Sequence, residues 1–235
     1  MEKVNYNSEL FDVLRDLVSI SNSVIIKKEN DQIVIRKADS DVTIVYSLKA
    51  PNEYFNFPSN NDDVTFYNYG EFYQYLKSFT NPDIFIDNKK ITLKENNSKI
   101  DYVLSNPESF EKKVPKEPNF GEADVSFNFS PADHDEIVKM ITLIKPKKAR
   151  ISGNHEKINI SIFNQLHDNL FEKVFSVTNA KGEQEIDFLV FTDTFLHIPP
   201  KREYTINIRS SGFLKVSLIN NAMNLDIVTG KVKTN

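Results

Sequence analysis

The chain has 235 residues, of which 40% are apolar and 26% are charged, and its formal net charge is −4. This length predicts one large domain or two smaller ones, and the apolar content is sufficient for a full core. The absence of cysteine excludes disulfides, zinc ribbons and thiol catalysis, and the acidic net charge argues against a strongly basic nucleic-acid-binding protein while leaving room for a local basic patch.

No targeting or membrane segment is predicted. The first residues, MEKVNYNSEL, carry acid and lack the apolar core of a signal peptide. No run of apolar residues approaches the roughly 18 that a membrane-spanning helix needs. We therefore expect a soluble, cytoplasmic protein.

The first half of the chain is predicted to contain strands and two helices. After a short strand at 3–6, Asn7 or Ser8 caps a helix whose apolar face is Leu10, Val13, Leu14 and Leu17. The second helix is expected over 69–79. The remaining strands of this half are expected at 24–28, 33–37, 42–48, 53–57, 64–67, 84–86, 91–93 and 100–104.

A segment without apolar periodicity separates the two halves. It contains Pro107, Pro115 and Pro118 together with several lysines and glutamates, which is typical of an extended, exposed linker. We therefore predict an N-terminal domain at 1–106, a connector at 107–122 and a C-terminal domain at 123–235.

The clearest local signature lies between Ser126 and Phe163, which reads as strand, helix and hairpin. Ser130 before Pro131 is typical of a helix start. The first turns of this helix carry the acids Asp133, Asp135 and Glu136, and its apolar face is Ile137, Val138, Ile141 and Ile144. Further on we expect strands at 171–177, 186–190, 204–208, 213–218 and 225–228, a turn at 179–182 and a helical segment at 193–197.

Taken together, a strand, a helix and about three strands recur four times. An internal repeat of this kind carries more weight than any local motif. It predicts an α+β protein made of two similar halves. The alternative is an ordinary α+β protein whose halves are alike by accident.

Enzyme motifs are weak. The four histidines, His134, His155, His167 and His197, share no metal-ligand spacing, and there is no phosphate-binding glycine loop or nucleophile elbow. His134, Asp135 and Glu136 are adjacent, but neighbouring helix residues point apart, which favours a solvated helix start over an active site. We predict no catalytic residue, no metal site and no cofactor.

Basic residues accompany every predicted helix. If the helices share one face, that face would be less negative than the rest of the protein and could contact phosphates without reading sequence. The alternative is that these side chains only complement helix dipoles. The candidate DNA-contacting residues are Arg15, Lys77, Lys139, Lys145, Lys147 and Lys148.

This layout resembles the DNA polymerase sliding clamps, in particular the two-domain clamps of T-even-type bacteriophages and, more remotely, proliferating cell nuclear antigen. The resemblance is carried by VLRDLVSISNSVIIKKENDQIVIRKADSDVTIVYSL at Val13 to Leu48 and by HDEIVKMITLIKPKKARISGNHEKINISIFN at His134 to Asn164. The linker also falls where the family has its interdomain connector. The resemblance covers essentially the whole chain.

The resemblance implies two DNA-clamp domains, each with two helices packed on antiparallel sheets, that assemble into a pseudo-sixfold ring around duplex DNA. Two domains per chain imply a homotrimer, with the edge strand near 99–104 pairing with the one near 170–177 of the next copy. The implied partners are double-stranded DNA, a DNA polymerase and a clamp loader, in the cytoplasm of a phage-infected bacterial host. A pocket for partner peptides is implied near Ala38, Val114, Phe213 and Val228.

Three other functions stay open at this point. The same fold could form a monomeric viral processivity subunit that binds DNA on one face. The chain could be a structural or assembly protein whose strand edges drive oligomerisation. An enzyme with a carboxylate site around His134 to Glu136 is the last alternative.

Overall fold

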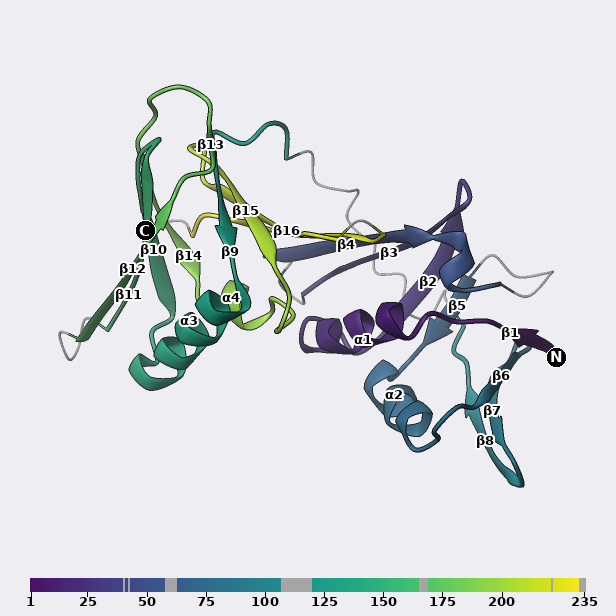
Figure 1. Cartoon of the computed structure of the whole chain (residues 1–235). Coiled ribbons are helices and arrows are strands. Elements are labelled where there is room, and N and C mark those ends of the chain that lie inside the picture. Colours follow the sequence, from purple (N-terminus) through teal and green to yellow (C-terminus); the bar gives the residue numbers. More distant parts are fainter. Residues whose placement is uncertain are drawn as a thin grey trace. The chain divides into compact units, whose positions relative to one another are not determined.

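The computed structural model describes residues 1–39, 41, 43–57, 63–106, 120–164, 169–220 and 222–232 (Figure 1). The chain divides into two compact units. Unit 1 comprises Met1–Ala38 and Ser47–Lys116, and unit 2 comprises Asp39–Tyr46 and Glu117–Asn235. The predicted domain boundaries remain a prediction, since most of the connector lies outside the described residues.

Each unit is built from two copies of one β-α-β-β-β repeat. The first repeat runs β1 (Glu2–Val4), α1 (Ser8–Asp16), β2 (Val24–Glu29), β3 (Gln32–Ala38) and β4 (Ile44–Pro51), and all of it except the first three residues of β4 belongs to unit 1. The second runs β5 (Asp63–Phe66), α2 (Tyr69–Lys77), β6 (Asp83–Ile86), β7 (Lys90–Glu95) and β8 (Ser98–Val103). Two short 3-10 turns interrupt this order, η1 (Leu17–Ser19) and η2 (Asn52–Tyr54).

Unit 2 follows the same order. Its first repeat is β9 (Val125–Phe129), α3 (Pro131–Ile144), β10 (Lys148–Gly153), β11 (Lys157–Asn164) and β12 (Asn169–Ser176). After the short strand β13 (Asn179–Ala180), the second repeat is β14 (Ile186–Phe191), α4 (Asp193–Leu196), β15 (Tyr204–Arg209), β16 (Phe213–Leu218) and β17 (Asn224–Gly230). The four-fold repeat predicted from the sequence and the α+β class are therefore confirmed.

The repeats of a unit are joined by exchange of their first strands. In unit 1, β1 pairs with β6 in the sheet β1-β6-β7-β8, and β5 pairs with β2 in the strand order β5-β2-β3-β4. In unit 2, β14 pairs with β10 in the sheet β12-β11-β10-β14, and β9 pairs with β15 in the order β13-β9-β15-β16-β17. Each repeat therefore completes the sheet of its neighbour.

Each of the three longer helices begins directly after a residue whose side chain caps its first turn. The side chain of Asn7 accepts hydrogen bonds from the amides of Glu9 and Leu10, and Asn68 accepts one from Glu71. Ser130 and Asp133 form a capping box with Pro131 in the first turn of α3, as the sequence predicted for the start of that helix. These caps satisfy amides that have no partner within the helix.

Different side chains fill the cores of the two units. Unit 1 has an aromatic cluster in which Phe11, Phe66, Phe72 and Tyr102 contact one another at centroid separations of 4.8–6.1 Å. In unit 2, α3 buries His134, Ile137 and Ile141 and contacts β11. Burial of each large apolar side chain stabilises the fold by about 1.5–3 kcal/mol.

Two local predictions are wrong. The expected strand at 53–57 is replaced by η2, because the Phe55 amide bonds back to the Asn52 carbonyl at 3.3 Å, and Phe55 then forms only an isolated bridge with Tyr6. The expected turn at 179–182 begins with the short strand β13, which pairs with β9. No helix in the described residues is long and apolar enough to cross a membrane.

Candidate nucleic-acid interface

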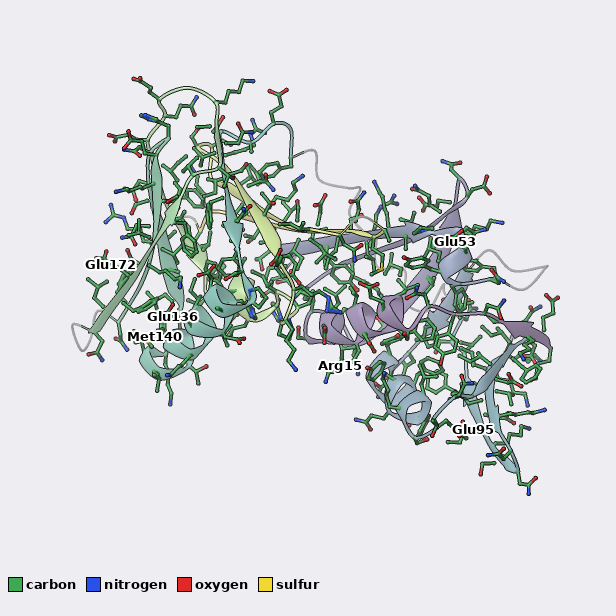
Figure 2. All side chains as sticks on the ribbon, viewed as in Figure 1. Arg15, Glu53, Glu95, Glu136, Met140 and Glu172 are labelled. Carbon is green, nitrogen blue, oxygen red and sulfur yellow. The ribbon has the colours of Figure 1, made fainter. Side chains whose placement is uncertain are left out.

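Two of the predicted DNA-contacting residues meet in unit 1, around a tyrosine. Arg15 lies in the last turn of α1 and Lys77 is the last residue of α2, and these two helices are in contact (Figure 2 labels Arg15). The Arg15 guanidinium carbon lies 5.9 Å from the centre of the Tyr73 ring, and Lys77 Nζ lies 5.2 Å from it. Both side chains are about half exposed, at 56% and 53%.

Each of these cations has a carboxylate partner. Arg15 Nη1 lies 2.7 Å from Asp16 Oδ1, and Lys77 Nζ lies 3.3 Å from Asp12 Oδ1. Tyr73 Oη donates to the same Asp12 oxygen at 2.6 Å. We name Asp12, Arg15, Asp16, Tyr73 and Lys77 the Tyr73 cluster. Its two cations and two carboxylates balance in charge.

The pKa values in the Tyr73 cluster reflect this pairing. The hydrogen bond with Asp16 raises the pKa of Arg15, and partial burial followed by the bond to Asp12 raises that of Tyr73. Partial burial acts to lower the pKa of Lys77, but its bonds with Tyr73 and Asp12 outweigh this effect and the pKa is raised. Both basic groups are therefore held in their charged forms.

The four predicted residues of unit 2 lie along and after α3. Lys139 is exposed on the helix, Lys145 ends it in a left-handed conformation with φ 53°, Lys147 is exposed, and Lys148 opens β10. None of these four lysines forms an ion pair with another described residue. They are the uncompensated positive charges of this helix and of the segment that follows it.

The segment after α3 is fixed to the start of α4. Thr192 donates from its amide to the Lys147 carbonyl at 3.2 Å and from its hydroxyl to the Pro146 carbonyl at 2.9 Å. These bonds hold the backbone of the lysine-bearing segment, so its side chains extend from a defined support.

Two of the acids in the first turns of α3 are neutralised by a residue that the sequence did not point to. Lys173 of β12 forms an ion pair with Asp133 at 2.9 Å and another with Glu136. The bonds of Asp133 with Lys173 and Ser130 outweigh the effect of its partial burial and lower its pKa. Figure 2 shows Glu136 and Met140 on the same side of α3. Asp135 remains exposed.

His134 is a buried core residue, so the prediction that it belongs to a solvated helix start is wrong. It is 5% exposed, and its Nε2 lies 3.1 Å from the Phe195 carbonyl of α4. The ring therefore ties α3 to α4. The described residues contain no group of three or more histidine, cysteine or acidic side chains placed to hold a metal ion.

The residues predicted for a partner pocket are described in part. Phe213 is 46% exposed and Val228 8% exposed, on the neighbouring strands β16 and β17, where Lys215 pairs with Val228. Lys215 Nζ lies 5.2 Å from the ring of Phe120, a buried residue that packs there. Ala38 ends β3 and is half-buried, and Val114 lies outside the described residues.

Two sheets end in strands that carry exposed apolar side chains. β8 is the last strand of one sheet in unit 1, and Val103 on it is 73% exposed. β12 is the edge of a sheet in unit 2, and Leu170 and Val174 are 59% and 61% exposed. Edge strands of this kind present unpaired backbone groups to another chain.

Solved structures of proliferating cell nuclear antigen (PCNA) share this fold. The chain resembles the A. fulgidus PCNA bound to the C-terminal region of FEN-1, with a TM-score of 0.77 and 12% identity over 100% of both chains. The PCNA of Entamoeba histolytica matches with a TM-score of 0.77 and 12% identity over 98% of both chains. The PCNA2–PCNA3 complex of Sulfolobus tokodaii gives 0.73 and 15% identity, over 98% of this chain and 99% of that chain.

Sequence comparison gives no corresponding match. No protein-family model matches the chain, and no curated protein matches it. Identities this low establish a common fold and nothing further. Over its whole length, the chain has the fold of the PCNA-type sliding clamps.

Proposed function

We propose that the protein is a sliding clamp, a processivity factor that encircles duplex DNA and tethers a replicative DNA polymerase. It acts as a ring of three copies and has no catalytic activity of its own. The observation that carries this proposal is the whole-chain likeness to PCNA, which covers 98–100% of both chains in each comparison.

Ring closure is attributed to the strands β8 and β12. Each is an edge strand that carries exposed apolar side chains. A heterologous contact between β8 of one copy and β12 of the next closes into a ring when the rotation between copies fits. A clamp ring contains six domains, so two domains per chain give a homotrimer. The PCNA2–PCNA3 complex is a precedent for association between chains of this fold.

DNA contact is attributed to cations on the helices. Lys139, Lys145, Lys147 and Lys148 have no ion partner among the described residues, so they are available to phosphates. Contacts to phosphates carry no sequence information and weaken with salt. A clamp needs such contacts to be weak, because it has to hold DNA topologically and still slide.

Partner binding is attributed to the residues for which the resemblance implies this role, Ala38, Val114, Phe213 and Val228. The A. fulgidus PCNA is a precedent, since it was solved with the C-terminal region of FEN-1. The proposed partners of this chain are a DNA polymerase and a clamp loader. Tethering a polymerase to the ring raises its effective concentration at the primer end.

The proposed setting is a bacterial cytoplasm during infection by a T-even-type bacteriophage. This assignment rests on the sequence resemblance to the two-domain phage clamps. A monomeric processivity subunit of the same fold is the main competing function, and it would bind DNA without a closed ring.

Mass in solution, measured by light scattering, tests the ring. We expect about three times 27.1 kDa for the native chain. Val174→Lys on β12 should reduce the mass to that of one chain, because a buried unpaired ammonium at the strand junction is costly. The matched control is Ile219→Lys, which changes an apolar side chain that is 49% exposed outside the two edge strands. A monomer at high concentration would overturn the trimer, and so would equal effects of the two variants.

A further inference from the structure

The proposed DNA-contacting residues of the two units differ in whether they form ion pairs with acidic side chains. In unit 1, Arg15 and Lys77 are paired with acids, whereas Lys139, Lys145 and Lys147 in unit 2 have no ion partner among the described residues. We propose that Asp12 and Asp16 hold the two unit 1 cations away from phosphates, so that unit 2 supplies the grip on DNA. This inference rests on the proposed clamp function and deepens it.

The geometry of the Tyr73 cluster supports a restraint stronger than a single surface pair. An isolated exposed ion pair contributes little stability, so a phosphate could displace one acid easily. Asp12 is held more firmly, because it accepts from Tyr73 Oη at 2.6 Å and from Lys77 Nζ at 3.3 Å. The Tyr73 ring in turn lies within 6 Å of both cations, at 5.2 and 5.9 Å. The two cations therefore share the Tyr73 ring as a contact, and the same Tyr73 side chain holds Asp12 beside Lys77.

Two acids of α3 in unit 2 are paired with a residue outside the proposed DNA-contacting set. Asp133 and Glu136 pair with Lys173, a residue of the sheet, and not with the lysines at the end of α3. This pairing removes two negative charges that would otherwise repel phosphates, while Lys139 and Lys147 stay exposed and unpaired. Asp12 is thus a positioning residue that limits DNA contact. Lys173 favours DNA contact, because it neutralises two acids that would repel phosphates.

The physical consequence is an uneven grip. Phosphate contacts made by unit 2 contribute a salt dependence of about 0.9 per contact to the slope of log affinity against log salt concentration. Unit 1 contributes less to this slope than its two cations would if they were unpaired, because each cation must first break its ion pair with a carboxylate. An uneven grip lowers the resistance to sliding, because fewer phosphate contacts have to break at each step.

The test measures binding of the full-length protein to a fluorescent linear duplex across a salt series. Asp12→Asn frees Lys77 and should raise affinity several-fold at low salt and steepen the slope by up to about 0.9. Asp12→Glu should restore the native slope. Adding Lys77→Met to Asp12→Asn should cancel the gain, which a merely structural role for Asp12 would not produce.

A matched control removes the same charge elsewhere in unit 1. Glu53 on η2 is exposed and has no ion partner among the described residues, and Figure 2 shows it well apart from Arg15. Glu53→Gln should change neither affinity nor slope by more than the general charge effect. Equal gains from Asp12→Asn and Glu53→Gln would overturn the inference, as would no gain from Asp12→Asn.

The experiments distinguish failure of this inference from failure of the proposed clamp function. If Lys139→Glu combined with Lys147→Glu weakens binding while Asp12→Asn has no effect, the restraint in unit 1 is wrong and the clamp proposal stands. If the double lysine variant binds like the native protein, the assignment of the grip to unit 2 is wrong. If neither the native protein nor Asp12→Asn binds at low salt, both are overturned.

Discussion

Tyr73 donates a hydrogen bond from Oη to Asp12 Oδ1 at 2.6 Å and so joins α2 to α1. The two residues are far apart in the sequence, and α1 and α2 are in contact in a unit whose two repeats exchange their first strands. The bond contributes to the stability of this helix pair and holds the Asp12 carboxylate beside Lys77.

Tyr73→Phe should lower the free energy of unfolding by about 1 kcal/mol at neutral pH, because it removes one hydrogen bond to a carboxylate. The pKa of Tyr73 is raised in the folded protein, so its contribution is complete below the ordinary value of about 10 and is lost as the pH rises through the raised value. Urea unfolding at pH 7 and in alkaline buffer measures this. The difference between native and variant protein should shrink in alkali, and a constant difference would contradict the assignment.

Lys173→Met should lower the free energy of unfolding by about 1 kcal/mol or more at neutral pH, because Asp133 and Glu136 lose a partly buried partner. The pKa of Asp133 is lowered, so its contribution is present above the unfolded value of about 3.9 and is lost as the pH falls through the lowered value. Native and variant stabilities should therefore converge in acid. Lys157→Met is the control, since Lys157 is exposed on β11 and has no ion partner among the described residues.

Gly153→Ala should destabilise unit 2 by about 3 kcal/mol or more. Gly153 has φ +148°, and a Cβ there would lie 2.1 Å from the Lys157 carbonyl oxygen in the β10–β11 hairpin. Gly182→Ala is the control, because Gly182 has φ +82° but nothing within 4 Å of its Cβ position. It should show only the strain of the left-handed conformation. Thermal unfolding of both variants checks this, and equal melting temperatures would refute the steric explanation.

Lys139→Glu combined with Lys147→Glu should shorten the products of a polymerase that depends on the clamp. The expected cause is the loss of phosphate contacts, so the difference from the native protein should be largest at low salt and should narrow as salt is raised. Primer extension on a long primed template measures product length. Lys157→Glu in the same unit is the control, and a defect of equal size there would indicate a general charge effect.

The repeat architecture could be predicted from the sequence because apolar periodicity, helix caps and turn residues are local signals. Ser130 before Pro131 predicted the start of α3, and the capping box is present. The exchange of first strands could not be predicted in this way, since β1 could have paired with its own repeat as readily as with β6. The strand predicted at 53–57 failed because one 3-10 turn needs only a single backbone bond, from Phe55 to Asn52.

Of the residues in the candidate site, the sequence predicted only the positively charged ones. Arg15, Lys77 and the lysines after α3 stood out by their recurrence beside helices. Their partners did not, because Tyr73 and Lys173 come from other elements and carry no motif. The sequence therefore could not distinguish the cations of unit 1, which have acidic partners, from the lysines of α3 and the following segment, which have no ion partner among the described residues.

The most direct test of encirclement uses duplex DNA whose ends can be blocked. The protein is added to a linear duplex with biotinylated ends, with streptavidin bound either before or after the protein, and the complex is captured by cross-linking at low salt. A ring threads over free ends, so we predict complex formation when the ends are blocked afterwards and little when they are blocked first. Equal complex formation in both orders would contradict a ring and indicate a protein that binds DNA on one open face.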